Sequence, residues 1–486
     1  MTGIPRELIN DAFHITQGNR EKAITEKHQE LKSTIIGLYD PRVWFMTDAA
    51  LAVHVACILR DTANPIGLII VDGPSSEKTT VLDFFEGLPM NHWVDKFTPA
   101  SFLTQSANVK ESQLKKVDLL PKIAYKTMIV PEMAPLFSQP KEILMESYAI
   151  LARVLDGRGL SSSGGVHGHR ELKGDYIFNL LGATTPLSQT AWNTMGKVGS
   201  RLTFLHVPSR LSRHERMKRS KAIMTSNLHY ATKRRMAKQA IRKFTDFFFS
   251  QFNTEDYTLP EDVPEHLQSK EALLRHCGYL PRSFSWDSQQ DDEDVIDIMS
   301  QLAEFATKAR SDLRIWTEQQ DGHTETNSTG AVVEGVDRLT SILYSLAKSH
   351  ALVSGCGGVS REQLPLIVAV TLSSLPDNRM KAVELLVDPT LKYKKSAVGT
   401  FTIHELMKSM SCSDGTATKV MRALELLGLG EIEGGVGQTS STFRLNEDYE
   451  WFITDEFRQY FRSWDEPKLT EKRVQERVVP FPMRPS

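Results

Sequence analysis

Apolar residues along this chain gather into short runs that are separated by longer segments with helical spacing. Four runs are apolar almost throughout and are predicted to be strands: residues 66–72, 126–133, 175–186 and 201–208. A strand that is apolar on both sides must be covered on both faces, and helical segments lie between these runs. The pattern therefore predicts an α/β fold built on a mainly parallel sheet.

Helical spacing extends over much of the remaining chain. Residues 1–40 are helical and polar, whereas residues 48–60 carry a continuous apolar face. Helical periodicity resumes from residue 334 to about 375, and residues 399–450 follow the order helix, turn, helix, hairpin. The Gly/Thr/Ser-rich stretch 318–333 is predicted to be a loop.

These changes of pattern divide the chain into six parts. They are an N-terminal helical segment (1–40), an α/β core (41–210), a helical and basic insertion with flexible loops (211–333), a helical lid (334–395), a small helix–turn–helix and hairpin domain (396–455) and a C-terminal tail (456–486).

Composition agrees with a soluble globular protein of two or three domains, since the 486 residues are 40% apolar and 24% charged. The four cysteines are far apart and form no CxxC pair, which argues against a zinc site or a disulfide framework. No apolar run approaches the roughly 20 residues that span a bilayer, and the first residues lack a signal-peptide pattern. We expect a cytoplasmic protein with no membrane partner.

Charge is unevenly distributed although the formal net charge is only −2. Between Arg201 and Lys243 there are 13 Lys or Arg and a single acid, Glu215. Such a run either contacts a phosphate backbone or forms a solvated helix face.

The first strand runs into a candidate phosphate-binding loop, in the stretch LIIVDGPSSEKTTVLDFF from Leu68 to Phe85. Such a loop needs inward-pointing backbone N–H groups, a lysine for the outer phosphates and a hydroxyl for Mg²⁺. Lys78 and Thr79 supply the last two, but Asp72 and Glu77 stand where the consensus has glycine. The carboxylate of Glu77 would repel phosphate. The candidate nucleotide-binding residues are Gly73, Pro74, Ser75, Ser76, Glu77, Lys78, Thr79 and Thr80.

The alternative for this stretch is a plain strand–turn–helix connection capped by Ser76. Other strand ends favour the nucleotide site. The second strand ends in Glu132, which is either the catalytic base or the acid on the metal side, or else a carboxylate that caps a helix. The third ends near Thr184 and Thr185, which could hold a water molecule. An arginine is expected after the last strand, commonly acting across a subunit interface, and the segment GSRLTF offers Arg201.

Residues 48–210 resemble the core of an AAA+ ATPase, most closely the minichromosome maintenance (MCM) helicase branch. PSSEKTT stands at that branch's phosphate loop, which also lacks glycine before the lysine, and GSRLTF resembles its arginine-finger segment. Downstream, DRLTSILYSLAKSHALVSGCGGVSREQLPLIVAVTL resembles the sensor-2 helix of the lid, which makes Arg338 the sensor-2 arginine. Short ATPases of phages and integrative elements share this arrangement.

The resemblance does not extend to residues 1–40 or 211–333. It implies a P-loop AAA+ fold with a C-terminal winged helix, ATP as ligand, and Mg²⁺ held by Thr79 and Glu132. It also implies a catalytic set of Glu132, Thr185, Arg201 and Arg338, and we expect this carboxylate and both guanidinium groups to converge on Lys78. The departures at Asp72, Glu77 and Pro131 put efficient hydrolysis in question more than the fold.

Nucleic-acid contacts are expected from two places. The stretch DGRGLSSSGGVHGHR is interpreted as a mobile loop, and in the MCM-like arrangement Arg158, Arg170 and Lys173 near it would face nucleic acid in a central channel; otherwise it is a surface loop. Within 396–455, the second helix would expose Thr418, Lys419 and Arg422 as a recognition helix. Winged helices also bind proteins.

The sequence thus predicts an ATP-dependent, helicase- or translocase-like motor that hydrolyses ATP at the interfaces of a homo-oligomeric ring or arc. It would act on nucleic acid, with DNA favoured, in the replication of mobile DNA or in defence against it. One alternative is an ATP-binding switch or scaffold that binds DNA and hardly hydrolyses ATP. Another is a winged-helix transcription regulator with a degenerate core.

Overall fold

The computed structural model describes residues 6–461, except for 63, 75, 105–116, 165–167, 200, 209–212, 226–228, 253–255, 321–322, 332, 392 and 435–440. Its centre is a five-stranded sheet in the order β2-β3-β6-β1-β7, with every neighbouring pair parallel. The strands are β1 (Gly67–Val71), β2 (Asn91–Trp93), β3 (Thr127–Val130), β6 (Asn179–Thr184) and β7 (Leu202–His206). The parallel α/β sheet and its four expected strands are confirmed, and β2 was not expected.

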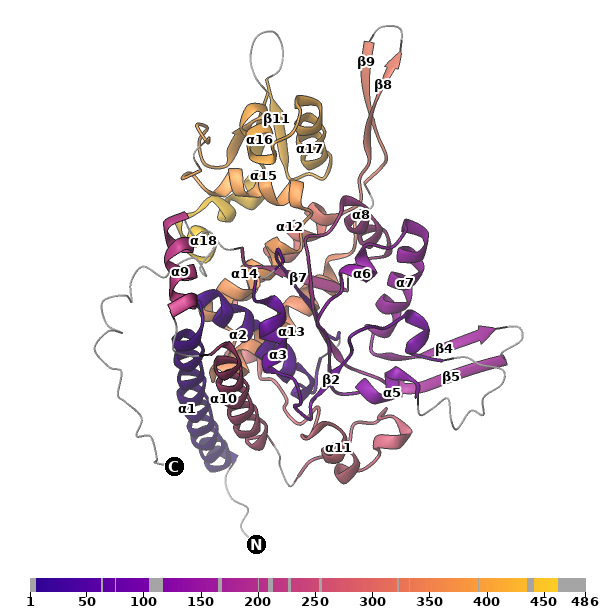
Figure 1. Cartoon of the computed structure of the whole chain (residues 1–486), viewed down its shortest axis with the longest axis vertical. Helices are drawn as coiled ribbons and strands as arrows, with labels where there is room; N and C mark the ends of the chain where they lie inside the picture. The colour runs from indigo at the N-terminus through magenta and orange to yellow at the C-terminus, as the bar shows by residue number, and fades with distance from the viewer. Residues whose placement is uncertain are drawn as a thin grey trace.

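Helices enclose this sheet (Figure 1). Every residue of β1, β3 and β6 is buried, which requires cover on both faces. Helix α2 packs on β1 and β6, α13 packs behind α2, and α14 packs on β7. The longer helices are α1 (Arg6–Leu38), α2 (Pro41–Val55), α7 (Lys141–Val154), α8 (Gln189–Val198), α9 (Arg213–Thr225), α10 (Tyr230–Ser250), α12 (Glu293–Arg310), α13 (Val336–Ser354), α14 (Leu364–Ser373), α15 (Asp377–Val387) and α17 (Asp414–Leu426). The shorter ones are α3 (Lys78–Phe84), α5 (Leu119–Ile123), α6 (Ala134–Phe137), α11 (Lys270–Cys277), α16 (Ile403–Met410) and α18 (Asp455–Tyr460).

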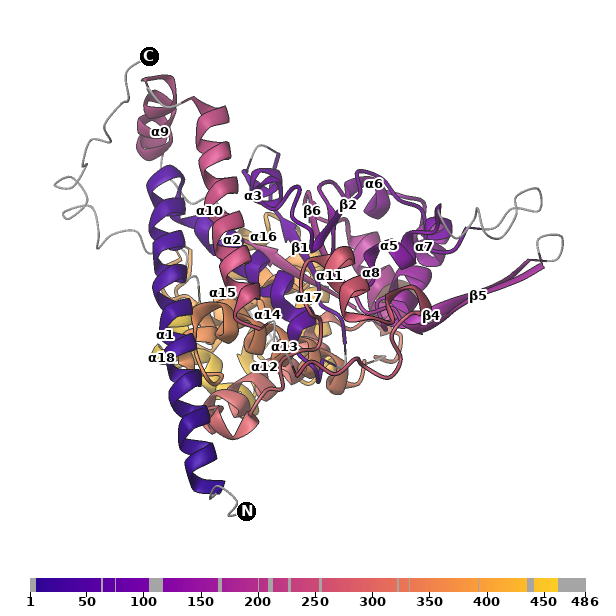
Figure 2. The same ribbon diagram turned by 90° about the horizontal axis from the view of Figure 1, so that it is seen from below.

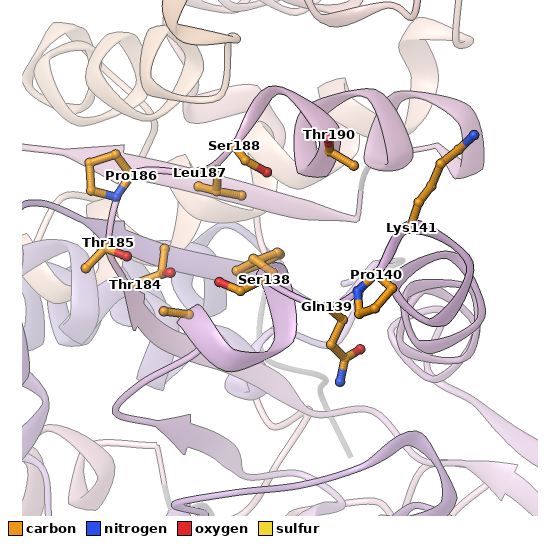
Figure 3. Close-up of a pocket in the computed structure, with 12 residues that line it drawn as sticks. Ser138, Gln139, Pro140, Lys141, Thr184, Thr185, Pro186, Leu187, Ser188 and Thr190 are labelled. Atoms are coloured by element: carbon orange, nitrogen blue, oxygen red, sulfur yellow. The ribbon is translucent and has the colours of Figure 1, made fainter.

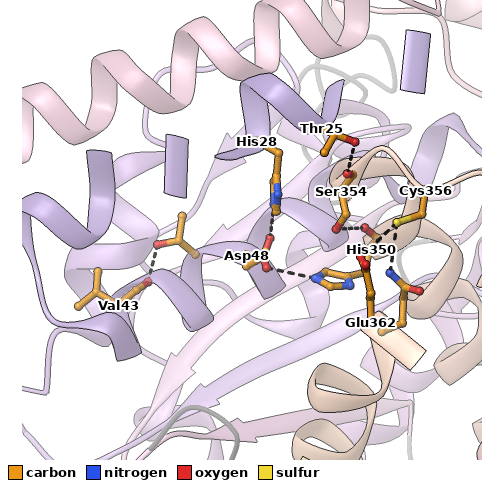
Figure 4. A network of polar contacts seen from close by, with 10 residues as sticks. Thr25, His28, Val43, Asp48, His350, Ser354, Cys356 and Glu362 are labelled. Carbon is orange, nitrogen blue, oxygen red and sulfur yellow. Dashed lines mark hydrogen bonds and ion pairs between the residues drawn. The ribbon is translucent and has the colours of Figure 1, made fainter. Parts of the chain in front are cut away.

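The long helix α1 is attached to the body by a buried polar cluster (Figure 4). His28 on α1 contacts Asp48 on α2 at 2.7 Å between Nε2 and Oδ1, and His350 on α13 contacts the other carboxylate oxygen at 3.1 Å. Burial alone raises the pKa of Asp48, but the two imidazole rings outweigh it and hold that pKa well below its usual range. The cluster joins three helices that are distant in sequence.

The insertion also packs on the body rather than standing apart. Figure 2 shows α10 beside α1, and α10 also contacts α3. Arg234 pairs with Asp83 at 2.8 Å, Lys238 pairs with Glu86, and Arg242 donates to the carbonyl of Gly87. Part of the basic run therefore binds α3 and the turn after it, so these cations are not a free phosphate-binding face.

Two stretches expected to be loops form β-hairpins instead. Strands β4 (Arg158–Gly164) and β5 (Gly168–Asp175) are antiparallel and extend away from the body (Figure 2). Strands β8 (Ile315–Gln320) and β9 (His323–Ser328) pair with Gln320 opposite His323, leaving two residues between them. Those residues are Asp321 and Gly322, a dipeptide that favours two-residue hairpin turns, although they lie outside the described residues. That turn signal was overlooked.

The C-terminal part has the expected order of helix, turn, helix and hairpin. Helices α16 and α17 are followed by β11 (Gly430–Glu433) and β12 (Thr442–Leu445), which form an antiparallel sheet with β10 (Thr400–Thr402) in the order β10-β12-β11. None of the described helices is both long and apolar enough to cross a membrane.

Candidate functional site

The loop after β1 has the backbone form that a phosphate loop requires, despite its composition. Glu77 has φ 71° and ψ 0°, the left-handed conformation in which side chains are disfavoured, and Lys78 begins α3 directly after it. A left-handed residue followed by a right-handed one makes adjacent N–H groups point to one side, which favours an anion. Glycine is common at such a position because it has no Cβ, so Glu77 retains the backbone conformation without the residue that suits it.

Lys78 is nearly buried, with 5% of its surface exposed. Its Nζ donates to the carbonyl oxygen of Gly73 at 3.2 Å. Within the described part of the chain, no carboxylate lies within ion-pair distance of this ammonium group. A buried cation without a counter-charge is costly, so the loop favours an incoming anion.

The negative charge of Asp72 is compensated by two neighbouring groups. Its Oδ1 accepts from the N–H of Gly73 at 2.7 Å, and its Oδ2 lies 3.9 Å from a guanidinium nitrogen of Arg42, at the start of α2. A Cβ at Gly73 would meet no atom within 4 Å, so this glycine is not required by packing inside the chain. The first departure from the consensus is thus offset by a neighbouring arginine.

The other loop residues have separate surroundings. Helix α3 begins at Lys78, and its N-cap is Glu77 without a side-chain cap bond, so the expected cap by Ser76 is wrong. Thr79 and Pro74 are exposed, whereas Thr80 is buried and its hydroxyl lies 2.8 Å from the hydroxyl of Tyr230 on α10. Ser75 lies outside the described residues.

Glu132 and the threonines of β6 share the carboxyl edge of the sheet with this loop. Val130 is level with Gly182 and Val71 with Thr184, so Glu132, two residues past Val130, lies near the level of Thr184. Adjacent strands are about 4.8 Å apart, so Glu132 is roughly 10 Å from β1. A Cβ at Gly182 would meet the sulfur of Met133 at 2.4 Å, so glycine lets this turn pack closely on β6.

The Glu132 carboxylate is exposed and caps a helix. Its Oε1 accepts from the N–H of Ala134 at 2.9 Å, at the start of α6. The capping alternative is therefore present in the structure, and the second carboxylate oxygen has no bond to Ala134. No cluster of three or more His, Cys, Asp or Glu side chains suited to a metal exists among the described residues. Only Thr79 and Glu132 remain as expected oxygen ligands, a set that suits Mg²⁺ where phosphate and water complete the shell.

A cavity of about 430 Å³ opens beside the end of β6 (Figure 3). Thr184 and Thr185 lie at one side of it, and Lys141 and Thr190 line it as well. Thr184 is buried, whereas Thr185 is partly exposed and better placed to contact a ligand. Lys78 is not among the described residues of the lining, so this cavity is beside the candidate phosphate loop rather than at it.

The two arginines are not near Lys78, contrary to the expectation that all four side chains converge within one chain. Arg201 stands before β7, not after it, and Gly67 pairs with Leu202, so this arginine lies at the amino edge of the sheet. The five residues of β1 separate the two edges by roughly 15 Å. Parallel strands place their two ends on opposite edges, which the linear spacing did not reveal.

Arg201 and Arg338 are brought together instead. Nε of Arg201 lies 3.2 Å and Nη2 of Arg338 lies 3.7 Å from the same oxygen of Asp156. Asp156 follows α7, Arg201 precedes β7 and Arg338 is in the first turn of α13. The shared carboxylate is a functional candidate that the sequence reasoning missed, because nothing in the local pattern marks it.

The candidates for nucleic-acid contact differ in availability. Arg158 is exposed, and Lys173 is exposed but 3.3 Å from Glu171. Arg170 donates to the fully buried carboxylate of Asp118 at 2.8 Å and is itself largely buried, so its expected role in contacting nucleic acid is not favoured. Buried pairing of this kind holds the hairpin on the body.

On the second helix of the C-terminal part, the expected exposure is found at two of three positions. Thr418 and Arg422 on α17 are exposed, and Arg422 pairs with Glu425 one turn later. Lys419 is partly buried because it faces β8 across a groove. Arg42 and Tyr230, which contact Asp72 and Thr80, were not anticipated, since both come from segments far from the loop in sequence.

Comparison with known proteins adds little to this geometry. No protein-family model matches the sequence, and no curated protein matches it. Among solved structures, one similar protein is a suggested ATPase from Cytophaga hutchinsonii, with 11% identity and a TM-score of 0.35 over 77% of this chain and 91% of the other. At this distance the similarity does not identify a function.

Proposed function

We propose that this protein binds and hydrolyses ATP at the interface between neighbouring copies of the chain. The observation that carries the proposal is Lys78, a nearly buried ammonium group bonded to the carbonyl of Gly73 and preceded by the left-handed Glu77. A triphosphate would replace the carbonyl as partner of this cation and accept from the N–H groups of the loop. This site lies at the carboxyl ends of parallel strands, where ligands of such sheets bind.

Two copies are needed because the arginines face the other edge of the sheet. Arg201 and Arg338 share Asp156 at that edge and cannot reach Lys78 of their own chain. An adjoining copy would present them to the triphosphate held by Lys78, so a homo-oligomer, as a ring or an arc, is part of the proposal. Guanidinium groups supplied in this way stabilise the charge of the transferring phosphoryl group.

The remaining residues have defined roles in this site. Mg²⁺, when bound, would supply positive charge that offsets the charge of the outer phosphates of ATP. The hydroxyl of Thr79 and the carboxylate of Glu132 are the side chains that would hold it. Glu132 would also orient the attacking water, and Thr185 at the tip of β6 would contact this water or the outer phosphate. Because Glu132 already caps α6, both tasks fall on one carboxylate.

We assign the action of this ATPase to nucleic acid, DNA being favoured, as in the AAA+ motors of the MCM branch that the sequence resembles. The helix pair α16 and α17 with the hairpin β11–β12 supports a winged helix at the C-terminal end. The exposed Thr418 and Arg422 support contact with nucleic acid there. A helicase- or translocase-like cycle at the interfaces is the activity proposed.

The test is ATP turnover with and without single-stranded DNA, in the protein and in two variants. We expect Lys78→Ala and Arg201→Ala each to lower turnover at least tenfold, because each removes a charge from the same composite site. A mixture of the two inactive variants should regain activity, since roughly a quarter of randomly formed interfaces would join an intact Lys78 to an intact Arg201.

Recovery on mixing supports the shared site. Two inactive variants that stay inactive when mixed, although they associate, would contradict it. Arg275→Ala is the matched control, because this arginine is exposed on α11 and its loss should leave turnover unchanged.

A second candidate is an ATP-binding switch that hardly hydrolyses ATP. The helix-capping bond of Glu132 and the carboxylate at Glu77 favour it. Tight ATP binding that Lys78→Ala abolishes, without turnover in any variant, would support the switch over the motor.

A further inference from the structure

A basic groove lies between α8, the base of the β8–β9 hairpin and α17, with a volume of about 760 Å³. Figure 1 shows the hairpin rising beside the part that contains α16 and α17. The cationic side chains that line the groove are Lys141, Lys197, Arg314, Arg379 and Lys419, and the described residues of its lining include no Asp or Glu. The whole chain has 58 basic and 60 acidic residues, so this is a local concentration of positive charge.

Most of this charge is not neutralised by the protein. In the part of the chain that the structure covers, Lys141, Arg314 and Lys419 have no carboxylate within ion-pair distance. Lys197 lies 3.8 Å from Asp312, which is at the groove's margin.

Arg379 forms part of the groove's wall and bonds to backbone. It donates to the carbonyls of Ala309 and Ser311 at 2.6 and 2.7 Å. Burial lowers the pKa of Arg379 to about 10, so it remains charged at neutral pH. The groove therefore presents a positive potential that suits a polyanion.

An aromatic ring stands at this groove with its orientation fixed. Trp316 on β8 is 40% exposed, and its indole N–H donates to Glu318 at 2.9 Å. Glu318 also accepts from the side-chain amide of Asn327 at 3.0 Å. Trp316 thus lines the groove, is substantially exposed and is held in place by its indole N–H bond. Exposed aromatic faces of this kind stack on unpaired bases.

Amide side chains and a second cavity complete the groove. Gln189, Asn193 and Asn378 line it and can both donate to and accept from base edges. The groove shares Lys141 and Thr190 with the cavity at the tip of β6. A strand bound here would therefore lead from α17 towards the carboxyl edge of the sheet.

We propose that this groove binds single-stranded nucleic acid, with the backbone on the cations and a base stacked on Trp316. Charge alone would suit an acidic peptide equally, but an exposed aromatic ring among amide groups favours bases. A duplex is disfavoured because its bases are already stacked. This groove would be the nucleic-acid site of the proposed ATPase, and its biological role rests on that proposed function. Binding of the strand itself needs no ATP.

The experiment measures equilibrium binding of a labelled 20-nucleotide oligo(dT) to the full-length protein in the absence of ATP. Fluorescence anisotropy reports the binding, and the measurement is repeated over a range of salt concentrations. We expect Trp316→Ala to weaken binding about tenfold, as for the loss of one base–aromatic stack, and Trp316→Phe to restore most of it. Arg314→Gln with Lys419→Gln should lower the salt-dependence slope by about 1.4, since two phosphate contacts are lost.

Lys22→Gln with Lys32→Gln on α1 is the matched control, because it removes equal charge from another surface and should change neither value. Lys78→Ala should also bind the oligonucleotide normally, so failure of the ATP site and failure of the groove are separable. Three results would overturn the proposal. The groove and control pairs could weaken binding equally, or Trp316→Ala could leave the affinity unchanged. The protein could also bind poly-glutamate or a 20-base-pair duplex more tightly than oligo(dT).

Discussion

Glu77 has a left-handed backbone conformation that suits glycine, but it carries a charged side chain. Its left-handed conformation costs a non-glycine residue about 1 kcal/mol or more, and strain of this kind concentrates at functional positions. Its carboxylate lies near the phenol of Tyr39, whose pKa burial raises to about 12, with Tyr230 and Glu77 adding to the shift. Both the strain and the charge act on the candidate phosphate loop.

We expect Glu77→Gly to stabilise the protein by about 1 kcal/mol, because glycine adopts this backbone without strain. It should also tighten nucleotide binding, because the repelling carboxylate is lost. Urea denaturation and titration with a fluorescent ATP analogue measure the two effects.

Glu77→Ala separates these causes, since alanine removes the charge and keeps the backbone strain. Tighter nucleotide binding without added stability is expected for alanine. Weaker nucleotide binding in Glu77→Gly would show that the carboxylate assists the ligand rather than repelling it.

Among the helices, α10 has a role that its basic sequence did not indicate. It holds α3, the helix that begins with Lys78, through Arg234, Lys238 and the hydroxyl of Tyr230. Burial raises the pKa of Asp83, and Arg234 acts against that shift, so the carboxylate depends on its partner.

We therefore expect Arg234→Ala to destabilise the protein by about 1 kcal/mol and to weaken nucleotide binding, because a partly buried carboxylate loses its cation and α3 loses a support. The neighbouring Arg235, which is exposed, is the control for charge and helix propensity. Equal unfolding midpoints for Arg234→Ala and Arg235→Ala would argue against the support.

Strands could be predicted from the sequence where burial on both faces requires apolar side chains. The strands at 67–71, 127–130, 179–184 and 202–206 are apolar on both sides because helices cover both faces, and they were found. The hairpins β4–β5 and β8–β9 extend from the body and are polar, so no burial pattern marks them. Only the Asp321-Gly322 dipeptide pointed to the second hairpin.

The candidate site was predictable only in part for a related reason. Lys78, Glu132 and Thr185 each follow a strand in the same direction, so parallel pairing brings them to one edge. The positions of Arg201 and Arg338 depend on pairing across the whole sheet and on Asp156. The spacing of residues along the chain predicts neither the strand pairing nor the contact with Asp156.

For the whole molecule, acid sensitivity follows from a buried histidine. His54 on α2 is stacked on Phe85 with ring centroids 4.2 Å apart, and burial lowers its pKa to about 4. In the unfolded chain the ring binds a proton below about pH 6.5, whereas in the folded chain it does not until about pH 4. Stability should thus be full above pH 6.5 and fall by up to about 3 kcal/mol as the pH drops to 4.

Thermal unfolding between pH 7 and 4 measures this slope. His54→Gln should make it shallower without removing it, because burial also lowers the pKa of His276 to about 4. His404→Gln, at an exposed position on α16, should leave it unchanged. Asp48 acts in a lower range, because its depressed pKa maintains stability above about pH 4 and loses it below. An undiminished slope in His54→Gln would assign the sensitivity to other groups.

One carboxylate, that of Asp156, restrains two guanidinium groups at the edge opposite the phosphate loop. If a neighbouring copy delivers phosphate there, the phosphate must compete with Asp156 for both guanidinium groups, so two ion pairs oppose its engagement. After product release, Asp156 would draw the pair back to its resting position.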